Sequence, residues 1–372
     1  MRSIIPKLIL IFLVSNPSNS IIYGQSNTSA IPFNIEIKKH IKNIKSVKLS
    51  SIGKELTYIP LETNTNCLIQ NIYNVGLSES YIFIHDHDRI LQFDRSGKFT
   101  RQIGSNGRGP KEYFRIYDFC IDEQKKEVYI ISSPQLLSVF DFNGVFINAY
   151  KLSHRITQII LKDKNTFMFH LVNSPGLNDP SWIVTARNGK TLTTMKKSLT
   201  RINKPGVTVL NAPLYLFNNT AHFMEFGIDT LYYFKDYKKS PYAIFFLDDL
   251  KMDPDLLITE AIAKNHKFYD RKLSPGSIKE NETFLFIKLM HGFSNGYSCT
   301  IFSKNTNEVI FLKDNTFVND LSGGVPFWPK QIINDNLLVD YIDAFDLFKY
   351  PLPSSLRGKI TESSNPVLLI LK

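Results

Sequence analysis

Residues 81–113 read YIFIHDHDRILQFDRSGKFTRQIGSNGRGPKEY, and this stretch decides the fold. Large apolar residues alternate over residues 81–85 and again over residues 90–93, which predicts two β-strands. Gly97 predicts a tight turn, because glycine adopts a positive φ without steric cost. Residues 99–103 then return as a third strand. Because a three-stranded meander cannot bury its own faces, we expect neighbours built in the same way.

The same unit recurs along the chain. Each of the first three units has an apolar run, a glycine turn and a returning strand, with the turns at Gly97, Gly144 and Gly189. A period of about 45 residues, with about four short strands per unit, is typical of propeller blades. The remaining strand-like runs are residues 214–217, 222–226, 230–234 and 242–247 in a fourth unit, 284–290, 297–303 and 309–313 in a fifth, and 331–333, 337–341 and 367–371 in a sixth.

The two ends of the chain are expected to close the ring. Residues 56–61 form a strand-like run before the first unit, whereas the sixth unit has only three runs of its own. Adding residues 56–61 to the sixth unit would complete it and remove an exposed sheet edge. The sequence therefore predicts one all-β domain, a six-bladed β-propeller over residues 46–372.

One segment departs from the strand pattern. Residues 253–266 read DPDLLITEAIAKNH and predict a short helix, with Asp253 at the N-cap and Pro254 at the first helical position. We interpret residues 248–282 as a helical insertion between the fourth and fifth units. Long loops in compact folds are often functional, and a lid over apolar surface is the structural alternative.

The first 24 residues have the layout of a secretory signal peptide. Arg2 and Lys7 precede an apolar run over residues 8–14, and small polar residues follow. This run is too short to anchor the protein across a bilayer, and we expect no transmembrane segment after the signal is removed. No cysteine follows the apolar run, so a lipoprotein anchor is not evident. We therefore predict a signal peptide over residues 1–24, a spacer over residues 25–45, and a periplasmic or secreted protein.

The chain carries a formal net charge of +10 at pH 7, and its basic residues are scattered rather than gathered in one block. This distribution predicts either a solvated basic surface or attraction to anionic glycans and membrane surfaces. No nucleic-acid-binding motif is present, and we expect no nucleic acid as partner. The three cysteines, Cys67, Cys120 and Cys299, lack metal-site spacing. We expect small apolar residues on strands, with one disulfide as the alternative.

The opening stretch also resembles the fingerprint of a known family. In the exported six-bladed β-propeller proteins of Bacteroidetes, relatives of NHL-repeat propellers, a Phe-Asp-x-x-Gly-Lys-Phe turn leads to Ile-Gly and then to Gly-x-Gly-Pro-x-Glu-Tyr. The matching positions here are Phe93, Asp94, Gly97, Lys98, Phe99, Ile103, Gly104, Gly107, Gly109, Pro110, Glu112 and Tyr113. Residues 58–63 and 365–372 resemble the opening and closing strands of the family. The resemblance implies export and a six-bladed fold, and it implies no established reaction.

The glycine-rich segment 104–113 is a candidate anion site. Its backbone N–H groups and the Arg108 guanidinium could receive a carboxylate, sulfate or phosphate. No Lys-Ser/Thr follows, so the segment is not a nucleotide P-loop. The structural alternative is a crossing between blades, whose glycines allow close approach and in which Arg108 and Glu112 pair locally.

The run His85-Asp86-His87-Asp88 is a weaker candidate, for a metal. His85 and His87 would face one way in an extended chain and could bind a divalent cation. An Asp-rich turn after a strand is the structural alternative. We predict no cofactor, with a divalent metal held by His85, Asp86 and His87 as the alternative.

Other sites are less marked. The remaining histidines are isolated, and no Gly-x-Ser-x-Gly nucleophile elbow occurs. Trp182 and Trp328 stand near turns, where a tryptophan ring either stacks on a sugar or fills a core.

These observations favour a non-catalytic binding module that takes a glycan or anionic ligand, or a protein partner, in the cell envelope. Arg108, Glu112, Tyr113 and Trp328 are expected to line the central funnel or an adjacent face. The alternative is a metal-dependent hydrolase or lyase acting on glycans or peptides in the same funnel. An enzyme would hold a metal or clustered groups with shifted pKa values there, whereas a binding protein would present aromatic side chains and arginine.

Overall fold

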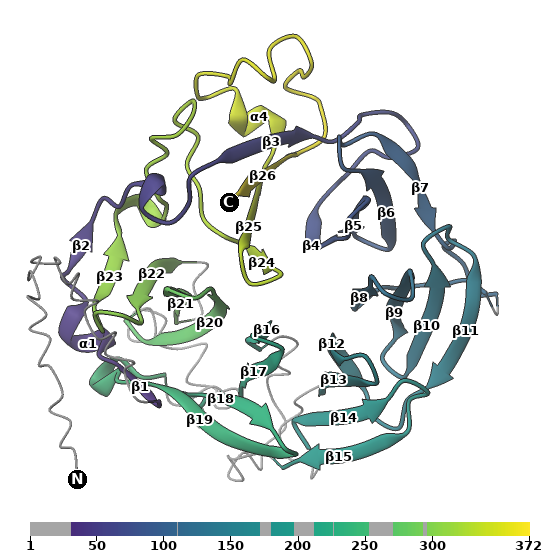
Figure 1. Cartoon of the computed structure of the whole chain (residues 1–372), viewed down its shortest axis with the longest axis horizontal. Helices are drawn as coiled ribbons and strands as arrows, with labels where there is room; N and C mark the ends of the chain where they lie inside the picture. The colour runs from purple at the N-terminus through teal and green to yellow at the C-terminus, as the bar shows by residue number, and fades with distance from the viewer. Residues whose placement is uncertain are drawn as a thin grey trace, which may run out of the picture.

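Six sheets, four of them four-stranded and two five-stranded, surround a central axis in the computed structural model, so the predicted six-bladed β-propeller is confirmed (Figure 1). The structure describes residues 31–109, 111–171, 180–196, 212–225, 227–252, 271–292 and 296–372. The expected signal peptide (1–24) and the expected helix (253–266) lie outside the described residues. In each of blades 1 to 5 the chain passes from the innermost strand outward.

Blades 1 to 3 are antiparallel meanders that follow one another in the chain. Blade 1 contains β4 (Ile72–Leu77), β5 (Tyr81–Asp86), β6 (Arg89–Asp94) and β7 (Phe99–Ile103). Blade 2 contains β8 (Asp118–Asp122), β9 (Glu127–Ser133), β10 (Leu136–Asp141) and β11 (Phe146–Lys151). Blade 3 contains β12 (Ile156–Asp163), β13 (Thr166–Leu171), β14 (Trp182–Ala186) and β15 (Thr191–Met195).

Blades 4 and 5 repeat the meander, and each gains an outer strand from the N-terminal segment. Blade 4 contains β16 (Leu214–Phe217), β17 (Thr220–Met224), β18 (Thr230–Lys235) and β19 (Lys238–Phe245). Blade 5 contains β20 (Leu273–Glu280), β21 (Phe284–His291), β22 (Tyr297–Ser303) and β23 (Val309–Leu312). The segment 248–282 is therefore not an insertion throughout. Its last part is β20, the innermost strand of blade 5.

The added outer strands are β1 (Phe33–Ile35), which pairs parallel with β19, and β2 (Ile44–Lys45), which pairs parallel with β23. Between them lies the short helix α1 (Ile37–His40), and Phe33, Ile35 and Ile37 are buried in the core between blades 4 and 5. The spacer that we expected to reach residue 45 is thus wrong over residues 33–45, because these residues bury apolar side chains against the propeller.

Blade 6 joins the two ends of the chain, as expected. It contains β24 (Gln331–Ile333), β25 (Leu337–Ile342), β26 (Val367–Leu371) and, from the N-terminal part, β3 (Leu56–Pro60). β3 and β26 pair antiparallel from Leu56 opposite Leu371 to Pro60 opposite Val367. Gly97 in the first turn of blade 1 has φ +90°, and a Cβ there would lie 2.1 Å from the Pro60 carbonyl oxygen. The turn read from the sequence therefore also packs blade 1 onto the closing strand.

The core consists of apolar clusters between adjacent blades, rich in phenylalanine. Short helices outside the sheets are α4 (Ala344–Leu347) and the 3-10 turns η1 (Leu49–Ser51), η2 (Asp248–Leu250) and η4 (Lys313–Asn315). All three cysteines are free thiols. Cys120 and Cys299 lie on strands as expected, whereas Cys67 lies in a turn, where its Sγ is 3.1 Å from the Glu62 carbonyl oxygen.

Candidate functional site

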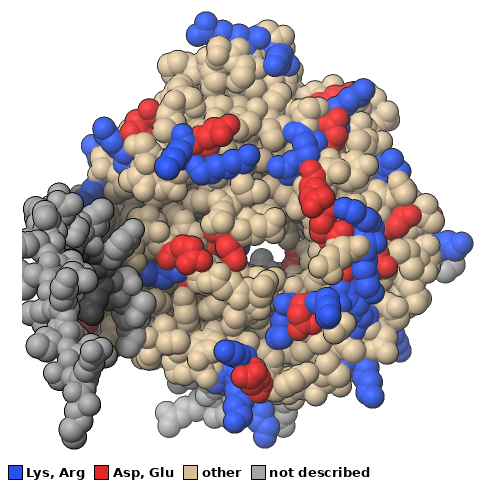
Figure 2. Space-filling view, viewed as in Figure 1, with Lys and Arg blue, Asp and Glu red and all other residues tan. Residues whose placement is uncertain are grey.

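A channel of about 1200 Å³ runs along the axis of the propeller. The innermost strands of all six blades line it: β4, β8, β12, β16, β20 and β24. Figure 2 shows its opening at the centre of one face, with acidic and basic side chains scattered around it. The channel is the concave site at which residues from every blade converge.

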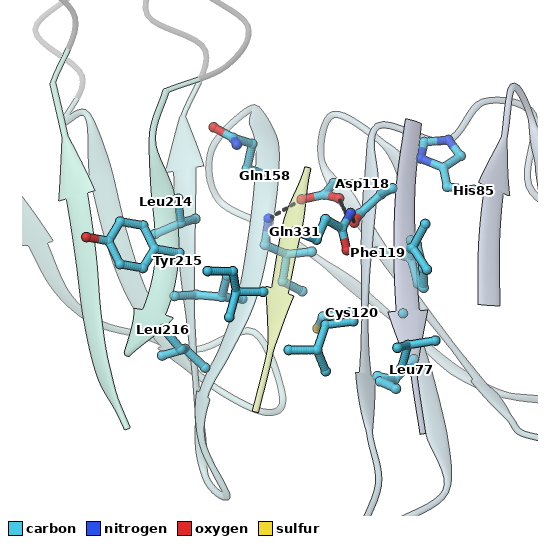
Figure 3. A pocket seen from close by; sticks show the side chains of 18 of the residues that line it. Leu77, His85, Asp118, Phe119, Cys120, Gln158, Leu214, Tyr215, Leu216 and Gln331 are labelled. Carbon is cyan, nitrogen blue, oxygen red and sulfur yellow. Dashed lines mark hydrogen bonds between the residues drawn. The ribbon is translucent and has the colours of Figure 1, made fainter. Parts of the chain in front are cut away.

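Four polar side chains of the inner strands form a belt inside the channel, and we call this group the polar belt. Its members are Asn74, Asp118, Gln158 and Gln331. Three of them are labelled in Figure 3, where they lie among apolar neighbours. An innermost strand has a free edge, so its backbone N–H groups need partners outside the sheet.

Asp118, the first residue of β8, links three blades. Its Oδ1 accepts a hydrogen bond from Asn74 Nδ2 of blade 1 at 2.8 Å, and its Oδ2 accepts one from the Ile159 N–H of blade 3 at 3.0 Å. Burial in the channel wall raises the pKa of Asp118 to about 6, although both donors and the positive charge of Lys279 favour the ionised form. Asp118 is therefore held in place and titrates close to neutral pH.

The other belt members join neighbouring blades in the same way. The Ala212 N–H of blade 4 donates to Gln158 Oε1 of blade 3 at 2.9 Å. The Gln331 side chain of blade 6 contacts the Asn74 side chain of blade 1. The polar belt thus supplies the inner edges with hydrogen-bond partners and fixes the shape of the channel.

Lys279 is the basic residue opposite the Asp118 carboxylate. It lies on β20 of blade 5 and lines the channel. Burial lowers the pKa of its ammonium group, and the charge of Asp118 acts in the opposite direction. Within the described part of the chain, no ion pair joins Lys279 to Asp118.

The remaining channel wall combines apolar side chains with charged ones, which include Glu79, Arg95 and Glu123. Leu77, Leu214 and Leu216 line it together with Cys120 (Figure 3). Burial raises the pKa of the Cys120 thiol well above its ordinary value. Because the thiolate is the nucleophilic form, Cys120 acts at neutral pH as an apolar wall residue.

Aromatic and basic side chains lie where the inner strands begin, and we call Tyr73, Arg115 and Tyr117 the aromatic rim. Tyr73 is 60% exposed, and its ring centroid lies 5.3 Å from that of His85. The Arg115 guanidinium lies 5.2 Å from the centroid of the Tyr117 ring. The rim offers flat apolar faces and one guanidinium at an entrance to the channel.

The glycine-rich segment forms a loop wrapped around Glu112. The Gly109 N–H donates to Glu112 Oε2 at 2.7 Å, and a Cβ on Gly107 would lie 1.9 Å from the same oxygen. The exposed Arg108 lies over the Phe114 ring, 4.7 Å from its centroid. Arg108 and Glu112 therefore have other partners, and the local pairing that we considered is wrong.

Tyr113 and Trp328 are packing residues in the structure. The Tyr113 hydroxyl donates to the Ile103 carbonyl oxygen at 2.7 Å, and only 1% of the residue is exposed. The Trp328 ring stacks on Phe317 with centroids 6.2 Å apart. The residues predicted to bind ligand fall in two places, with Arg108, Glu112 and Tyr113 in one loop and Trp328 at another blade interface. None of the four lines the channel, and ligand binding by them stays a prediction.

Trp182 fills the core. It is fully buried on β14, with its ring centroid 4.5 Å from that of His170. Of the two roles considered for this tryptophan, the structure supports packing.

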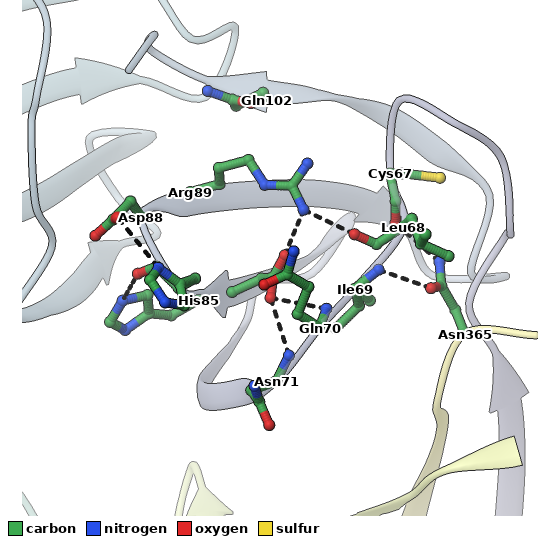
Figure 4. A network of polar contacts seen from close by, with 12 residues as sticks. Cys67, Leu68, Ile69, Gln70, Asn71, His85, Asp88, Arg89, Gln102 and Asn365 are labelled. Atoms are coloured by element: carbon green, nitrogen blue, oxygen red, sulfur yellow. Dashed lines mark hydrogen bonds and ion pairs between the residues drawn. The ribbon is translucent and has the colours of Figure 1, made fainter. Parts of the chain in front are cut away.

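The His85–Asp88 run is held by local contacts (Figure 4). Asp86 is buried, accepts the N–H groups of Gln70 and Asn71 at 3.0 Å each, and pairs with Arg89. Burial lowers the pKa of His85 to about 4, and its Nε2 lies 2.9 Å from the His87 carbonyl oxygen.

These contacts leave the metal hypothesis without support. No group of three or more His, Cys, Asp or Glu side chains suited to a metal ion is found in the part of the chain that the structure describes. That His85, Asp86 and His87 hold a divalent metal therefore stays a prediction.

Comparison with known proteins identifies the family. The model of a domain of unknown function, DUF4934, matches residues 32–372. The chain belongs to the DUF4934 family. Comparison with curated proteins gives no match. None of the helices within the described ranges is long and apolar enough to cross a membrane.

Two crystal structures share the fold of this DUF4934 protein. One is a predicted exported protein from Bacteroides fragilis, with a TM-score of 0.69, 19% sequence identity, and coverage of 91% of this chain and 99% of the other. The second is a member of the DUF4221 family from Bacteroides vulgatus, with a TM-score of 0.52, 11% identity, and coverage of 88% and 98%. At these identities the similarity establishes the fold alone.

Sequence reasoning missed the polar belt and Lys279. Each is a single polar residue within a short strand, and no motif surrounds it. The available signal was positional, because Asn74, Asp118 and Gln158 each lie in the strand that starts a blade. A search for polar residues at the same place in successive repeats would have found them.

Proposed function

We propose that this protein is an exported, non-catalytic binding module that takes a ligand into its central channel. The observation that carries the proposal is the channel itself, about 1200 Å³, with a wall from every blade and an aromatic rim at its entrance. Small-molecule sites in proteins are concave, mostly apolar, and carry a few fixed polar groups. The leucine side chains of the wall supply the apolar part of such a site, and the polar belt supplies its fixed polar groups.

Export is part of the proposal. It is supported by the signal-like layout of residues 1–24 and by the fold shared with a predicted exported protein. We place the protein in the periplasm or outside the cell. We propose, from the motif in residues 93–113, that the protein is related to NHL-repeat propellers.

The partner is a soluble glycan or anionic compound, or a protein of the cell envelope. Tyr73 and Tyr117 offer ring faces to a sugar or an apolar group, and Arg115 offers a charged donor to an anion. The net charge of +10 favours the approach of anionic partners.

Thermal melting with four classes of small compound tests this function. The panel contains neutral oligosaccharides, uronic acids, polyamines and zwitterions. A ligand at about 100 times its Kd is expected to raise Tm by roughly 2 °C or more. Tyr73→Ala should reduce the shift, whereas Tyr237→Ala, which removes another exposed tyrosine, should leave it unchanged. Equal shifts in both variants would place binding away from the rim.

An enzyme is the second candidate, and one observation favours it. Asp118 and Lys279 are two titratable groups with shifted pKa values in one cavity, a pattern that is frequent at catalytic sites. Asp118 would then act as the general acid or base of a hydrolase or lyase on glycans or peptides. In that case Asp118→Asn abolishes turnover and still binds the compound.

The metal-dependent form of this alternative has its own test. Elemental mass spectrometry of the purified protein, with melting before and after chelation, measures whether a metal is bound and stabilising. A stoichiometric metal whose removal lowers Tm would favour the hydrolase. His85→Ala should then lose that metal, which would locate the site.

A further inference from the structure

Two opposite charges face each other across the channel. Asp118 belongs to blade 2 and Lys279 to blade 5, and these blades lie on opposite sides of the ring (Figure 1). Both residues line the channel. The negative charge of Asp118 stabilises the ammonium form of Lys279, so each group is within the electrostatic range of the other.

Within the ranges that the structure describes, neither charge is neutralised by a direct ion pair. Among the described residues, no hydrogen bond or ion pair engages the Lys279 ammonium. The adjacent Glu280 is turned into the blade interface, where it accepts hydrogen bonds from the Tyr215 hydroxyl at 2.8 Å and from Lys304 Nζ at 3.0 Å. Lys279 lines the cavity, and among the described residues its three N–H donors have no partner.

Asp118 has acceptor capacity left. An ionised carboxylate offers about four acceptor positions, and Asn74 Nδ2 and the Ile159 N–H use two of them. These two donors also fix the carboxylate, so a ligand meets a preformed acceptor.

The pair discriminates among classes of ligand. A simple anion on Lys279 would bring negative charge towards Asp118, and a simple cation on Asp118 would bring positive charge towards Lys279. A molecule with a carboxylate at one end and an ammonium at the other satisfies both groups. Leu77, Leu214 and Leu216 supply the apolar wall for its carbon skeleton.

We propose that the channel ligand is a small zwitterion, a free amino acid or a short peptide, with its carboxylate on Lys279 and its ammonium on Asp118. This assignment rests on the proposed binding function and adds the class of ligand. The aromatic rim then serves as the entrance, outside the charged site.

Calorimetric titration of the full protein tests the assignment. The probes are glycine, diglycine and triglycine, which separate the two charges by increasing distances. The best probe is then compared with its N-acetyl form, which lacks the ammonium, and its C-terminal amide, which lacks the carboxylate. Each derivative is expected to bind roughly tenfold or more weakly, because a charge-assisted hydrogen bond is lost.

Two channel variants assign the ends of the probe. Lys279→Met should weaken binding of the free acid and abolish its advantage over the amide. Asp118→Asn should abolish the advantage of the free amine over the N-acetyl form. Lys98→Met, at an exposed lysine on the outer turn of blade 1, should leave both advantages intact.

The outcomes separate the ligand class from the binding function. If the free and the blocked peptides bind equally, the zwitterion assignment is wrong. If a neutral oligosaccharide or a uronic acid binds in a Tyr73-dependent way and no zwitterion does, the assignment fails and the binding function stands. If no compound of the four classes binds, the zwitterion assignment and the binding of a small ligand in the channel both fail.

Discussion

His222 is a buried histidine between aromatic rings, with no role in the channel. It is 3% exposed, its ring stacks on Tyr215 with centroids 5.2 Å apart, and it lies 4.4 Å from the ring of Tyr242. Burial lowers the pKa of His222 from 6.5 to about 4. The unfolded chain therefore binds this proton more tightly than the folded chain does.

This difference predicts a loss of stability in mild acid. The contribution of neutral His222 is fully present above pH 6.5 and is lost as the pH falls towards 4, a change of up to about 3 kcal/mol in the free energy of unfolding. Denaturant unfolding at pH 7 and pH 4.5 should show a smaller loss in His222→Gln than in the native protein. Asp118, whose pKa is raised, changes the stability in the opposite direction as the pH falls. Because Asp118 is present in both the native protein and His222→Gln, its effect cancels when the two are compared. An equal loss in both would contradict the prediction.

Gly97 gives a second prediction at the scale of one residue. Gly97→Ala combines a positive φ with a Cβ 2.1 Å from the Pro60 carbonyl oxygen, whereas Gly324→Ala has a φ of +72° and open space. The left-handed conformation alone costs about 1–2 kcal/mol, so Gly324→Ala should lose about that much stability. Gly97→Ala should lose clearly more in the same denaturant titration. Equal losses would mean that the contact with Pro60 relaxes freely.

The residues of the site show where sequence reasoning stops. The turn at Gly97 could be predicted from the sequence, because a tight turn depends only on a few neighbouring residues. The roles of Asp118 and Lys279 could not be predicted, because these residues lie on different blades and come to line one channel only after the ring has formed. Tyr113 and Trp328 were predicted to bind ligand because of their aromatic rings. In the structure these rings make packing contacts inside the protein.

At the scale of elements, the middle and outer strands were predicted well, and so were the inner strands β16 and β24, whereas the inner strands β4, β8, β12 and β20 were not predicted. β5, β6 and β10 are buried on both faces and read as apolar runs. β4 and β20 contain Gly76 and Gly276 and face a channel whose wall has both apolar and polar side chains, so neither strand shows clear periodicity. Four of the six strands that line the channel, β4, β8, β12 and β20, thus have a weak sequence signal.

The N-terminal strands give a prediction at this scale. β1 and β2 cover the outer edges of β19 and β23, which would otherwise present unpaired backbone groups. A protein lacking residues 1–45 should have a lower Tm and should self-associate, as measured by melting and light scattering. A protein lacking only residues 1–30 is the control and should have the Tm and the light scattering of the full chain. Identical behaviour of the two truncations would show that the edges need no cover.

For the whole molecule, closure of the ring is the feature with the largest expected effect. Leu369 on β26 is fully buried opposite Tyr58 of β3. Leu369→Ala should cost about 2–5 kcal/mol of unfolding free energy, and Leu192→Ala, at a residue 43% exposed, less than about 0.5 kcal/mol. Hydrogen exchange should show that amides of blade 6 open first in Leu369→Ala. If the amides of all blades exchange equally fast, blade 6, where β3 pairs with β26, is not the least stable part of the ring.

The pairing of β3 with β26 also sets the order in which the strands can pair after synthesis. β3 emerges near the start of the chain, and β26, its partner, is the last strand to emerge. Doubling the length of a loop costs only about 0.6 kcal/mol, so this arrangement is cheap at equilibrium. It is slow in time, since contacts between residues far apart in sequence form late in folding. During synthesis, β3 must therefore remain unpaired until residues 367–371 have emerged, so its edge stays open for nearly the whole of that time.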